Sequence, residues 1–515
     1  MIVGVLTSLY YLIPYYLDPY DYRRRFHGPR LAAFSNLWLA RAAQAAKRQT
    51  AVDEMHQKYG KEYLKNPGLD DDQATLIVDP AAFEAVYGHS SRLIKTDFYN
   101  EFFIDEPDMF TTQDRAAHAI KRKRVANIFS PQNILAFEPR IQQHIWKLCQ
   151  QWDYRCNAAV EEFAYLGFDV IGDLALGSSF GLVESQRDSV PLRSSASKHT
   201  TNVPIVAVTL AISEVGTTVA TWPAWCRPLI RYLPWNYYRS KGIFDFARLT
   251  ITKVDEKLDR VKRAGYQPED GPMVDLIDKL LELKGENGAH LSRQELLSEA
   301  FLFLFAGGDT TSNTLGAFCY LMATHRDVQK KLQAELDEYI PLELEVDDHG
   351  STTTPSSVVA SFDHIKNLPY LNACVKEVMR FQSVVGMGLP RAVPTGQTFT
   401  FKDQTFKEGS VISVPSLTIN QMDVWGPDAK AFIPERWMGP KTAEFTKYHA
   451  PFSFGTRACI GRNLATMQVS LVTATLFRRY DILLASSQPG HEVQIREAIQ
   501  RKVEHCNVTI KLRKG

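Results

Sequence analysis

A single apolar run, LLSEAFLFLFAGGDTTSNTLGAFCYLMATHR at residues 296–326, decides more about the architecture of this chain than any other segment. Its apolar side chains would nearly encircle a helix, and Ser292 with Glu295 forms a capping box just ahead of it. A helix that is apolar on every side is stable only when other elements cover it. We therefore predict a helix of about thirty residues that passes through the middle of a large domain.

The rest of the chain predicts a mainly α fold with a small β region. With 515 residues, of which 45% are hydrophobic, it can build a substantial core. Helical periodicity dominates residues 40–335, with TLIVDP (75–80) as a strand-like exception, and residues 390–437 change to short strands and turns. The polar segment 346–358 suggests a surface insertion. Since no internal repeat or strong linker is present, we expect one large domain.

Charge and cysteine content exclude several classes of protein. Lys and Arg number 59 against 58 Asp and Glu, so there is no positive excess to neutralise a nucleic acid backbone. The 7 cysteines are scattered and show no CxxC spacing. A disulfide scaffold or a zinc site is therefore not expected, and a reducing compartment is favoured.

The first seventeen residues, MIVGVLTSLYYLIPYYL, are uncharged and mostly apolar, and the basic run Arg23, Arg24 and Arg25 follows them. A helix of this length reaches about 25 Å, slightly less than the hydrocarbon core of a bilayer. We expect residues 1–17 to form a membrane anchor and residues 18–515 to form the domain behind it, on the cytoplasmic side. A core segment or a peripheral helix is the alternative.

Near the C-terminus, FSFGTRACIG (452–461) sets a lone cysteine among glycines, phenylalanines and an arginine. A single cysteine is usually a buried, inert thiol. Here the neighbours complete the pattern FxxGxRxCxG, formed by Phe452, Gly455, Arg457, Cys459 and Gly461. This pattern resembles the haem-binding loop of the cytochrome P-450 family of haem-thiolate monooxygenases. The resemblance implies a haem b cofactor (iron protoporphyrin IX) whose axial ligand is the thiolate of Cys459.

The chemistry of the loop agrees with the resemblance. The dipole of a helix that starts at Gly461 and the charge of the iron both favour the thiolate form of Cys459. Gly455 and Gly461 let backbone N–H groups approach the sulfur. Phe452 can shield the sulfur from water, and Arg457 suits a haem propionate because a guanidinium pairs with carboxylates in a fork.

Two shorter motifs resemble the buried Glu-Arg-Arg network of the same family. In KEVMR, Glu377 and Arg380 lie one helical turn apart, and alone they would be an ordinary solvated ion pair. PERW (434–437) follows with Arg436 as the third member. The resemblance gives the three residues a structural role beneath the cysteine loop.

The segment AGGDTT (306–311) places two glycines inside the long helix, where they are unfavourable. A packing kink would explain them. The resemblance instead implies that the segment crosses the distal haem face, where missing side chains leave room for dioxygen and substrate. Asp309 and Thr310 then resemble the acid–alcohol pair that delivers protons during oxygen cleavage.

HAIKRKR (118–124) reads as an ordinary basic helix face when taken alone. The family places a histidine or aromatic residue four positions before a basic residue to hold the haem propionates. His118 and Arg122 match this spacing, and Arg391 in GLPRAVP resembles a third propionate contact.

Longer stretches resemble the fungal benzoate para-hydroxylases within the family: 33–41, 95–103, 168–181, 413–419 and 424–437. Two substrates remain open, benzoate or a simple relative, and an intermediate of a fungal natural-product pathway. Asp105, Glu106 and Asp108 favour the second if they face the pocket, because they would repel a benzoate anion. If these carboxylates face solvent, they do not distinguish between the two substrates.

The resemblance implies a monooxygenase at the endoplasmic reticulum membrane, with its catalytic domain facing the cytoplasm and a small apolar or aromatic substrate. No GxGxxG follows a strand, so electrons must come from a separate NADPH-dependent reductase. A reductase-independent isomerase or dehydratase is a second class, against which Asp309 and Thr310 argue, and a haem electron carrier is a third. The segment 219–238, with Trp222, Trp225 and Trp235, can roof the access channel at the membrane or pack between helices.

Overall fold

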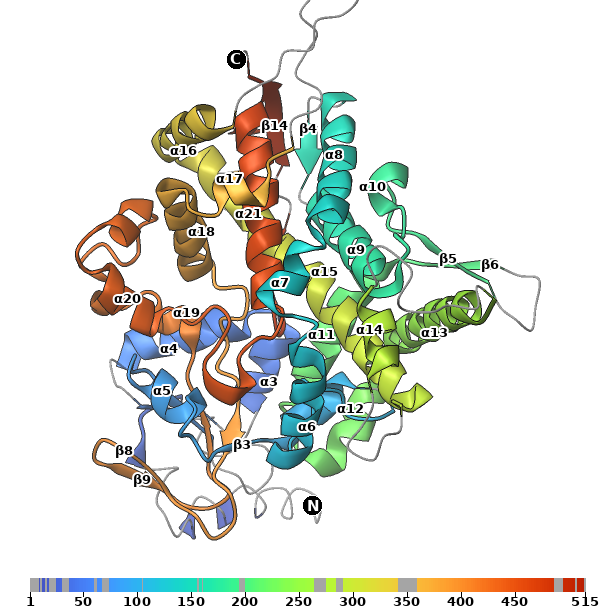
Figure 1. The fold of residues 1–515 in the computed structure, drawn as a ribbon. Helices are drawn as coiled ribbons and strands as arrows, with labels where there is room; N and C mark the ends of the chain where they lie inside the picture. Colours follow the sequence, from blue (N-terminus) through green and yellow to red (C-terminus); the bar gives the residue numbers. More distant parts are fainter. Residues whose placement is uncertain are drawn as a thin grey trace, which may run out of the picture.

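A computed structural model of the chain describes residues 25–29, 37–59, 63–66, 74–103, 105–154, 157–159, 161–193, 200–263, 275–283, 290–340, 359–485, 494–504 and 507–513, with positions 9, 12, 13, 16 and 17. Helices make up most of it, and short strands gather in small sheets at its margins (Figure 1). The expected mainly α fold with a small β region is confirmed.

The long apolar run forms α15 (Arg293–Thr324), and the predicted capping box starts it. The Ser292 hydroxyl accepts the Glu295 N–H at 3.1 Å, and the Glu295 carboxylate accepts the Ser292 N–H at 3.1 Å. Most side chains from Leu296 to Ala323 are buried. Other helices therefore cover α15 along its length, as the sequence predicts.

Helix α15 packs closely against α9 (Glu161–Leu176) where the two helices cross. A Cβ on Gly167 would lie 2.4 Å from the Gly308 carbonyl oxygen, and a Cβ on Gly308 would lie 2.6 Å from the Phe168 ring. Ser312 fixes the crossing by donating to the Phe163 carbonyl at 2.8 Å. A Cβ on Gly307 would likewise meet Ile171 at 2.7 Å. Close packing against α9 therefore explains both glycines of AGGDTT, and room for dioxygen is not needed to account for them.

The other helices surround this pair. The longer ones are α3 (Leu37–Gln44), α4 (Arg48–Tyr59), α6 (Arg115–Ala126), α8 (Glu138–Tyr154), α11 (Ile205–Val219), α13 (Pro234–Arg263), α16 (Arg326–Tyr339), α18 (Pro369–Phe381) and α21 (Arg462–Arg479). The shorter ones are α5 (Ala82–Tyr87), α7 (Pro131–Leu135), α10 (Leu182–Ser185), α12 (Arg227–Tyr232), α14 (Leu276–Glu282), α17 (Phe362–Ile365), α19 (Ser416–Ile419) and α20 (Thr442–Tyr448). Short stretches of 3₁₀ helix are η2 (Asp97–Phe102), η3 (Ala224–Cys226), η4 (Asp423–Trp425), η5 (Pro434–Met438) and η6 (Gly455–Arg457).

The largest sheet has the order β1-β2-β10-β7-β3. Its strands are β1 (Tyr63–Asn66), β2 (Ala74–Ile77), β10 (Val411–Ser413), β7 (Arg391–Ala392) and β3 (Ile94–Lys95). The strand expected in TLIVDP is β2. At the other edge, the register of β3 on β7 sets Lys95 directly opposite Arg391. Two like charges opposed across a strand pair are destabilising unless an anion lies beside them.

The remaining strands form smaller sheets near the C-terminus and on the surface. One sheet joins β11 (Tyr480–Leu484), β14 (Asn507–Leu512) and β4 (Asn157–Ala159), and three hairpins pair β12 (Gln494–Glu497) with β13 (Arg501–Glu504), β5 (Val190–Arg193) with β6 (Thr200–Val203), and β8 (Phe399–Phe401) with β9 (Gln404–Phe406).

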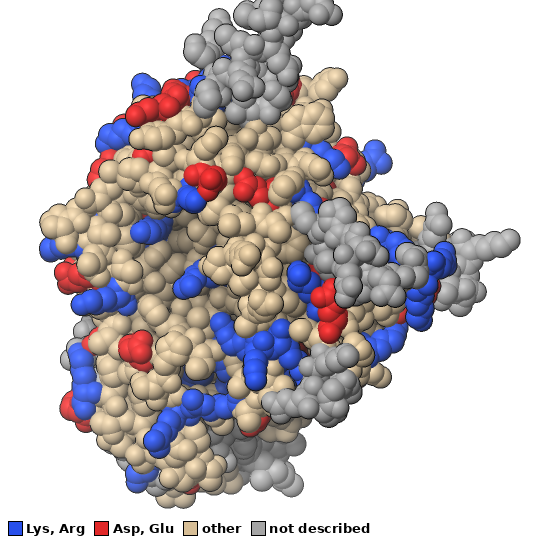
Figure 2. Space-filling model, viewed as in Figure 1, with Lys and Arg blue, Asp and Glu red and all other residues tan. Residues whose placement is uncertain are grey.

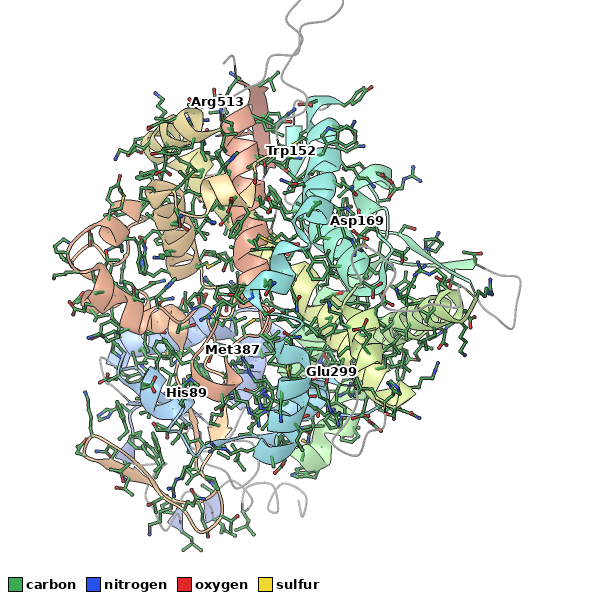
Figure 3. The ribbon with its side chains drawn as sticks, in the orientation of Figure 1. His89, Trp152, Asp169, Glu299, Met387 and Arg513 are labelled. Carbon is green, nitrogen blue, oxygen red and sulfur yellow. The ribbon has the colours of Figure 1, made fainter. Side chains whose placement is uncertain are left out.

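Aromatic side chains anchor the main core on both sides of α21. Trp152 of α8, labelled in Figure 3, packs with ring centroids 5.7 Å from Phe163 and 5.5 Å from Tyr480. Its indole N–H donates to the Glu162 carboxylate. The Trp152 side chain thereby joins α8 and α9 to the C-terminal sheet. Buried tryptophans commonly have such a hydrogen-bond partner for the indole N–H.

The predicted anchor over residues 1–17 lies almost wholly outside the described residues, and so does the insertion at 346–358. Leu12, Ile13 and Leu17 are described and exposed, Leu17 at 73%. Within the described residues, no helix combines the length and the hydropathy that crossing a bilayer requires. All five described cysteines are free thiols.

Candidate active site

The cysteine loop, residues 452–461, lies between α20 and α21 and is shaped by its own backbone. The Cys459 N–H donates to the Phe452 carbonyl at 2.8 Å. Gly455 has a φ of +66°, and a Cβ there would lie 2.3 Å from the Tyr87 carbonyl oxygen. Only glycine fits this position. Phe452 is half-buried and packs on the main core.

Cys459 is the exposed one among the five described cysteines. Burial nevertheless raises its pKa, while the Gly461 N–H and the charges of Arg122 and Arg462 lower it. A thiol that is surrounded by protein and still accessible lines an internal space. Since α21 begins directly after Gly461, the positive end of that helix also favours the thiolate.

Four cationic side chains and a histidine gather beside the loop: Lys95, His118, Arg122, Arg391 and Arg457. Burial and the charges of the other four lower the pKa of His118 to about 3, so its imidazole is neutral. Burial and the nearby arginines also hold the pKa of Lys95 well below its usual range. These cations repel one another in an enclosed place.

The hydrogen bonds of the cluster go to neutral oxygens, and Lys95 also faces aromatic rings. Arg122 donates to the Ala458 carbonyl at 2.7 Å, which ties α6 to the cysteine loop. Arg457 donates to the carbonyls of residues 112 and 113 at 2.6 and 2.9 Å. Arg391 donates to the Tyr99 hydroxyl at 2.5 Å. Within the described residues, none of the four cations forms an ion pair with a carboxylate.

A doubly anionic group would resolve this imbalance, and a haem carries two propionates. The donor set therefore fits the cofactor that the sequence predicts: a thiolate for the iron and a cationic cluster for the propionates. The structure brings His118, Arg122, Arg391 and Arg457 together, as expected for propionate contacts. Lys95 was missed, because its place in the cluster depends on the register of β3 with β7.

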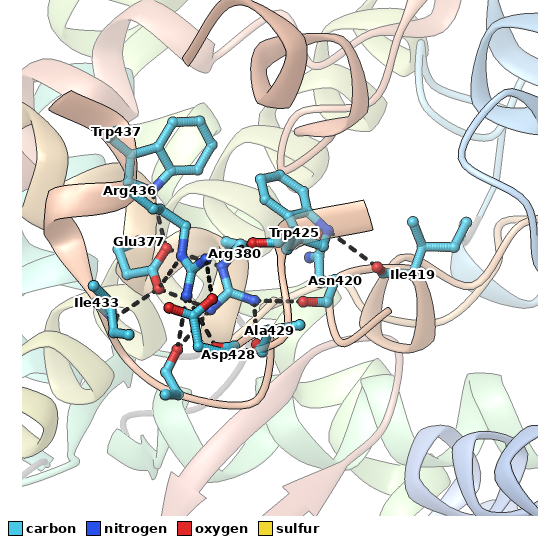
Figure 4. Close-up of polar contacts among 11 residues, drawn as sticks. Glu377, Arg380, Ile419, Asn420, Trp425, Asp428, Ala429, Ile433, Arg436 and Trp437 are labelled. Carbon is cyan, nitrogen blue, oxygen red and sulfur yellow. Dashed lines mark hydrogen bonds and ion pairs between the residues drawn. The ribbon is translucent and has the colours of Figure 1, made fainter. Parts of the chain in front are cut away.

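Glu377 is the centre of a fully buried polar network (Figure 4). Its carboxylate accepts from Arg380 at 2.7 and 2.9 Å and from Arg436 at 3.0 Å. The Trp437 indole and the Ile433 N–H complete its shell, each at 2.9 Å. Side-chain exposure is 0% for Glu377 and Arg380 and 4% for Arg436. The structure thus joins the three residues that the two motifs single out.

The network supports the segment that leads into the cysteine loop. Arg380 donates to the Ala429 and Ala431 carbonyls at 2.8 and 3.0 Å, and Arg436 donates to the Trp425 carbonyl at 2.7 Å. Beyond it, the Trp437 ring lies 4.7 Å from the His449 ring. His449 lies three residues before the cysteine loop. Its contact with Trp437, which belongs to the Glu377 network, therefore helps to hold the segment that leads into the loop.

On the other side, α15 turns an open face toward the middle of the domain. Ala306, Gly307 and Thr310 are half-buried, whereas the positions around them are buried. The Thr310 hydroxyl donates to the Ala306 carbonyl at 2.8 Å. Asp309 is 2% exposed and points elsewhere: burial raises its pKa, and Asn313 and Lys502 lower it. The acid and the alcohol therefore leave the helix in different directions.

The three carboxylates ahead of α6 lie in different surroundings. Asp105 is exposed and Glu106 is half-buried. Asp108 is buried and accepts from the Thr111 N–H at 2.7 Å within its own turn. Burial and the nearby Asp108 raise the pKa of Glu299 on α15 to about 8. The Glu299 carboxylate accepts the Met109 N–H at 3.0 Å; Glu299 is labelled in Figure 3. This acid on α15 was not anticipated.

The segment 219–238 forms η3, α12 and the first turn of α13. Trp225 and Trp235 are 71% and 51% exposed, while Trp222 is half-buried. Arg227 of α12 is ion-paired with Asp97 of η2 at 2.8 Å. Glu101 of η2 pairs with Arg227 at 3.6 Å and with Arg231. The segment therefore exposes aromatic side chains to solvent on one side and forms ion pairs with η2 on the other.

Comparison with known proteins extends over almost the whole chain. The family model "Cytochrome P450" matches residues 27–504. A benzoate 4-monooxygenase of Aspergillus niger is 36% identical, over 99% of this chain and 97% of its own. Pisatin demethylase of Fusarium vanettenii is 26% identical over 93% of this chain and 89% of its own. A crystal structure of a cytochrome P450 superposes with a TM-score of 0.70 at 18% identity, covering 90% of this chain and 94% of that one.

Proposed function

Because the chain belongs to the cytochrome P-450 family, we propose that it hydroxylates an intermediate of a fungal secondary-metabolite pathway, with electrons from a separate NADPH-dependent reductase. Monooxygenase activity follows from the family and from the similarity to benzoate 4-monooxygenase. The pathway is inferred from relatives such as tryprostatin B 6-hydroxylase of Aspergillus fumigatus. The observation that carries the proposal is Cys459, an accessible thiol beside a cationic cluster whose members form no ion pair with a carboxylate of the described residues.

Hydroxylation of benzoate at the para position is a second candidate. It rests on the relative from Aspergillus niger, with 36% identity over 99% of this chain. Asp105 faces solvent and Asp108 is bound within its own turn. Neither carboxylate therefore argues against an anionic aromatic substrate.

In the proposed reaction, the chain holds the cofactor and handles protons. A bound haem supplies activation of dioxygen, with electron density donated through its thiolate ligand. Cys459 Sγ would ligate the iron, and Arg122, Arg391, Arg457 and Lys95 would hold the propionates. The Thr310 hydroxyl can hold a water on the open face of α15. The Asp309 carboxyl lies buried on the side of Lys502, so protons from it would reach that water through further bridging waters and not by direct contact.

Replacing Thr310 by alanine removes the hydroxyl and leaves the fold intact. We expect product formed per NADPH to fall by about an order of magnitude or more, with peroxide released in its place. Both products are measured against NADPH consumption. Thr311→Ala is the matched control, because Thr311 is only 5% exposed and lies off the open face. Unchanged coupling in Thr310→Ala would remove the hydroxyl from the proposed proton path.

We also propose that the protein resides at the endoplasmic reticulum membrane with its catalytic domain in the cytoplasm. Exposed aromatic side chains of η3 and α13 support this, among them Trp225 at 71% and Tyr238 at 78%, because tryptophan and tyrosine favour the membrane interface. Basic side chains gather around α6 on the face seen in Figure 2. Such a face suits an acidic electron donor.

Omission of the reductase tests the proposed electron supply. With NADPH, dioxygen and a fungal reductase, we expect hydroxylated product from pathway intermediates, and product formation should cease when the reductase is left out. A haem-thiolate isomerase would continue to turn over without it, and an electron carrier would give no product in either case. Product that persists without reductase would therefore refute the proposal.

A further inference from the structure

Glu299 on α15 is a buried acid that the proposed reaction does not use. The residue is 4% exposed, and one oxygen of its carboxyl group accepts the Met109 N–H, in the turn ahead of α6, at 3.0 Å. The ammonium of Lys121 on α6 lies 3.9 Å from the same oxygen. The second oxygen, Oε2, is enclosed, and no residue in the described part of the chain donates to it. Burying a carboxyl group costs free energy, so its position against this turn calls for an explanation.

The turn that Glu299 contacts, residues 108–113, is braced by its own hydrogen bonds. The Asp108 carboxylate accepts the N–H and the hydroxyl of Thr111 at 2.7 and 2.9 Å, and the Asp108 N–H donates to the same hydroxyl at 3.0 Å. The Asp108 carbonyl accepts the N–H and the hydroxyl of Thr112 at 3.0 and 2.5 Å. The turn therefore behaves as one piece, and the hydrogen bond from the Met109 N–H fixes that piece to α15.

The same turn also contacts two members of the cationic cluster. Lys95 donates to the Phe110 carbonyl, and Arg457 donates to the carbonyls of residues 112 and 113 at 2.6 and 2.9 Å. These carbonyls engage some of the N–H groups of each cation and so fix the directions in which the remaining N–H groups point. Glu299 is therefore linked to the proposed propionate contacts through one short, braced stretch of backbone.

The groups around Glu299 favour its neutral form. Burial and the nearby Asp108 raise the pKa of Glu299 to about 8. Burial also raises the pKa of Asp108, but only to about 6, so at neutral pH Asp108 is ionised and Glu299 is not. Glu299 therefore accepts the Met109 N–H without placing a second negative charge beside the turn. Further charged groups near the two acids are Lys121 and Arg124 of α6, Glu295 of α15 and Lys95 of β3.

We propose that Glu299 is a positioning residue for the haem: it holds the turn through the Met109 N–H, and the turn in its place aims two cations of the cluster at the propionates. The inference rests on the proposed function and adds a residue to its cofactor site. Without Glu299, the carbonyls that Lys95 and Arg457 use would shift with the turn. The haem would then be held less firmly, and its reduction potential would fall, because nearby cations favour the reduced state with its additional negative charge.

Ionisation of Glu299 is expected to weaken the same hold. The new charge repels Asp108 in the turn, and it stays buried with Lys121 at 3.9 Å as its nearest cation. Since the pKa of Glu299 is raised above its ordinary value, the hold is complete at low pH and is lost as the pH rises through about 8. Both the rate of haem loss and the reduction potential of the wild type should therefore change with pH in this range.

The test compares Glu299→Gln with Glu299→Leu in the haem-loaded protein. The glutamine keeps an oxygen for the Met109 N–H and cannot ionise, whereas the leucine leaves that N–H buried without a partner. Haem loss is followed by transfer to apomyoglobin, and the reduction potential is followed by spectroscopic redox titration. At neutral pH we expect haem loss to be about tenfold faster in Glu299→Leu and within about twofold of the wild type in Glu299→Gln.

The pH profiles separate this role from a purely structural one. Between neutral pH and about pH 9, haem loss from the wild type should become about tenfold faster. The ferric–ferrous equilibrium should shift about tenfold toward the ferric form, which is about 59 mV for one electron. Glu299→Gln should lack both changes. Glu295→Gln is the matched control: it removes an acid one turn away on α15 that pairs with Arg124 at 3.0 Å, and it should keep the wild-type profile.

The outcomes are distinct. If the wild type shows the carbon-monoxide spectrum of a haem thiolate but has the same pH profile as Glu299→Gln, the positioning role is refuted and the monooxygenase proposal stands. Equally fast haem loss from Glu299→Gln and Glu299→Leu would also refute the role. If Glu299→Leu does not fold, the comparison of Glu299→Gln with the wild type still decides it. A wild type without that spectrum would refute the proposed function, and the role of Glu299 with it.

Discussion

Replacing Cys459 by serine is expected to abolish the reduced carbon-monoxide spectrum of a haem thiolate and to lower monooxygenase activity below detection. A serine hydroxyl stays protonated where the thiol is assisted by the Gly461 N–H, by Arg122 and by the start of α21. It also lacks the electron-donating sulfur on which oxygen activation depends. The purified variant is examined by difference spectroscopy and by product formation with reductase and NADPH.

Cys226→Ser is the matched control for this experiment. Cys226 is a free, buried thiol at the end of η3, and its Sγ donates to the Pro223 carbonyl at 3.2 Å. Its replacement changes the same atom far from the loop and should leave the spectrum intact. If Cys459→Ser kept the parental spectrum, the assignment of the iron ligand would be wrong, and the roles of the surrounding cluster would lose their basis.

The second large effect is expected at Glu377. Glu377→Gln keeps the shape of the side chain but removes the charge that neutralises Arg380 and Arg436, both buried. Breaking a buried ion pair in this way costs about 3–5 kcal/mol, because the remaining charge has no solvent and no partner. We expect a loss of that order in the free energy of unfolding and a protein that retains little haem. Denaturant titration and haem content measure the two effects.

Glu435→Gln provides the comparison within the same segment. Its carboxylate pairs with Lys331 at the surface, with side-chain exposures of 39% and 55%. An exposed pair contributes about 0–1 kcal/mol, so this variant should unfold near the wild type and keep its haem. Equal losses at positions 377 and 435 would contradict the structural role of the network.

Local sequence patterns predict the structure correctly where the contacts involved lie close together in the sequence. The capping box of Ser292 and Glu295 starts α15 as expected, and the apolar run makes that helix central because no other arrangement covers it. Gly455, Cys459 and Gly461 are close in sequence, so their loop could be anticipated as a unit. The one-turn spacing of Glu377 and Arg380 likewise predicts that their side chains meet, which is one of the two ion pairs of the buried network.

Contacts between distant segments could not be predicted in the same way. Lys95 joins the cluster only because β3 pairs with β7 in one particular register. Arg48 reads as an ordinary basic residue at a helix start, and only the fold shows that it is buried while Glu497, from a distant hairpin, accepts the neighbouring Gln49 N–H. The glycines of α15 suggested open space, whereas their packing partners lie on α9, about 140 positions earlier in the chain.

The glycine crossing of α15 and α9 has a consequence for engineering. The Gly308 carbonyl meets Gly167 there, and the Phe168 ring meets Gly308, so any residue larger than glycine at 167 or 308 would push the two helices apart. Mutant libraries that aim to broaden substrate range should therefore leave positions 167, 307 and 308 constant. Diversity belongs at Ala306, which is half-buried on the open face of α15.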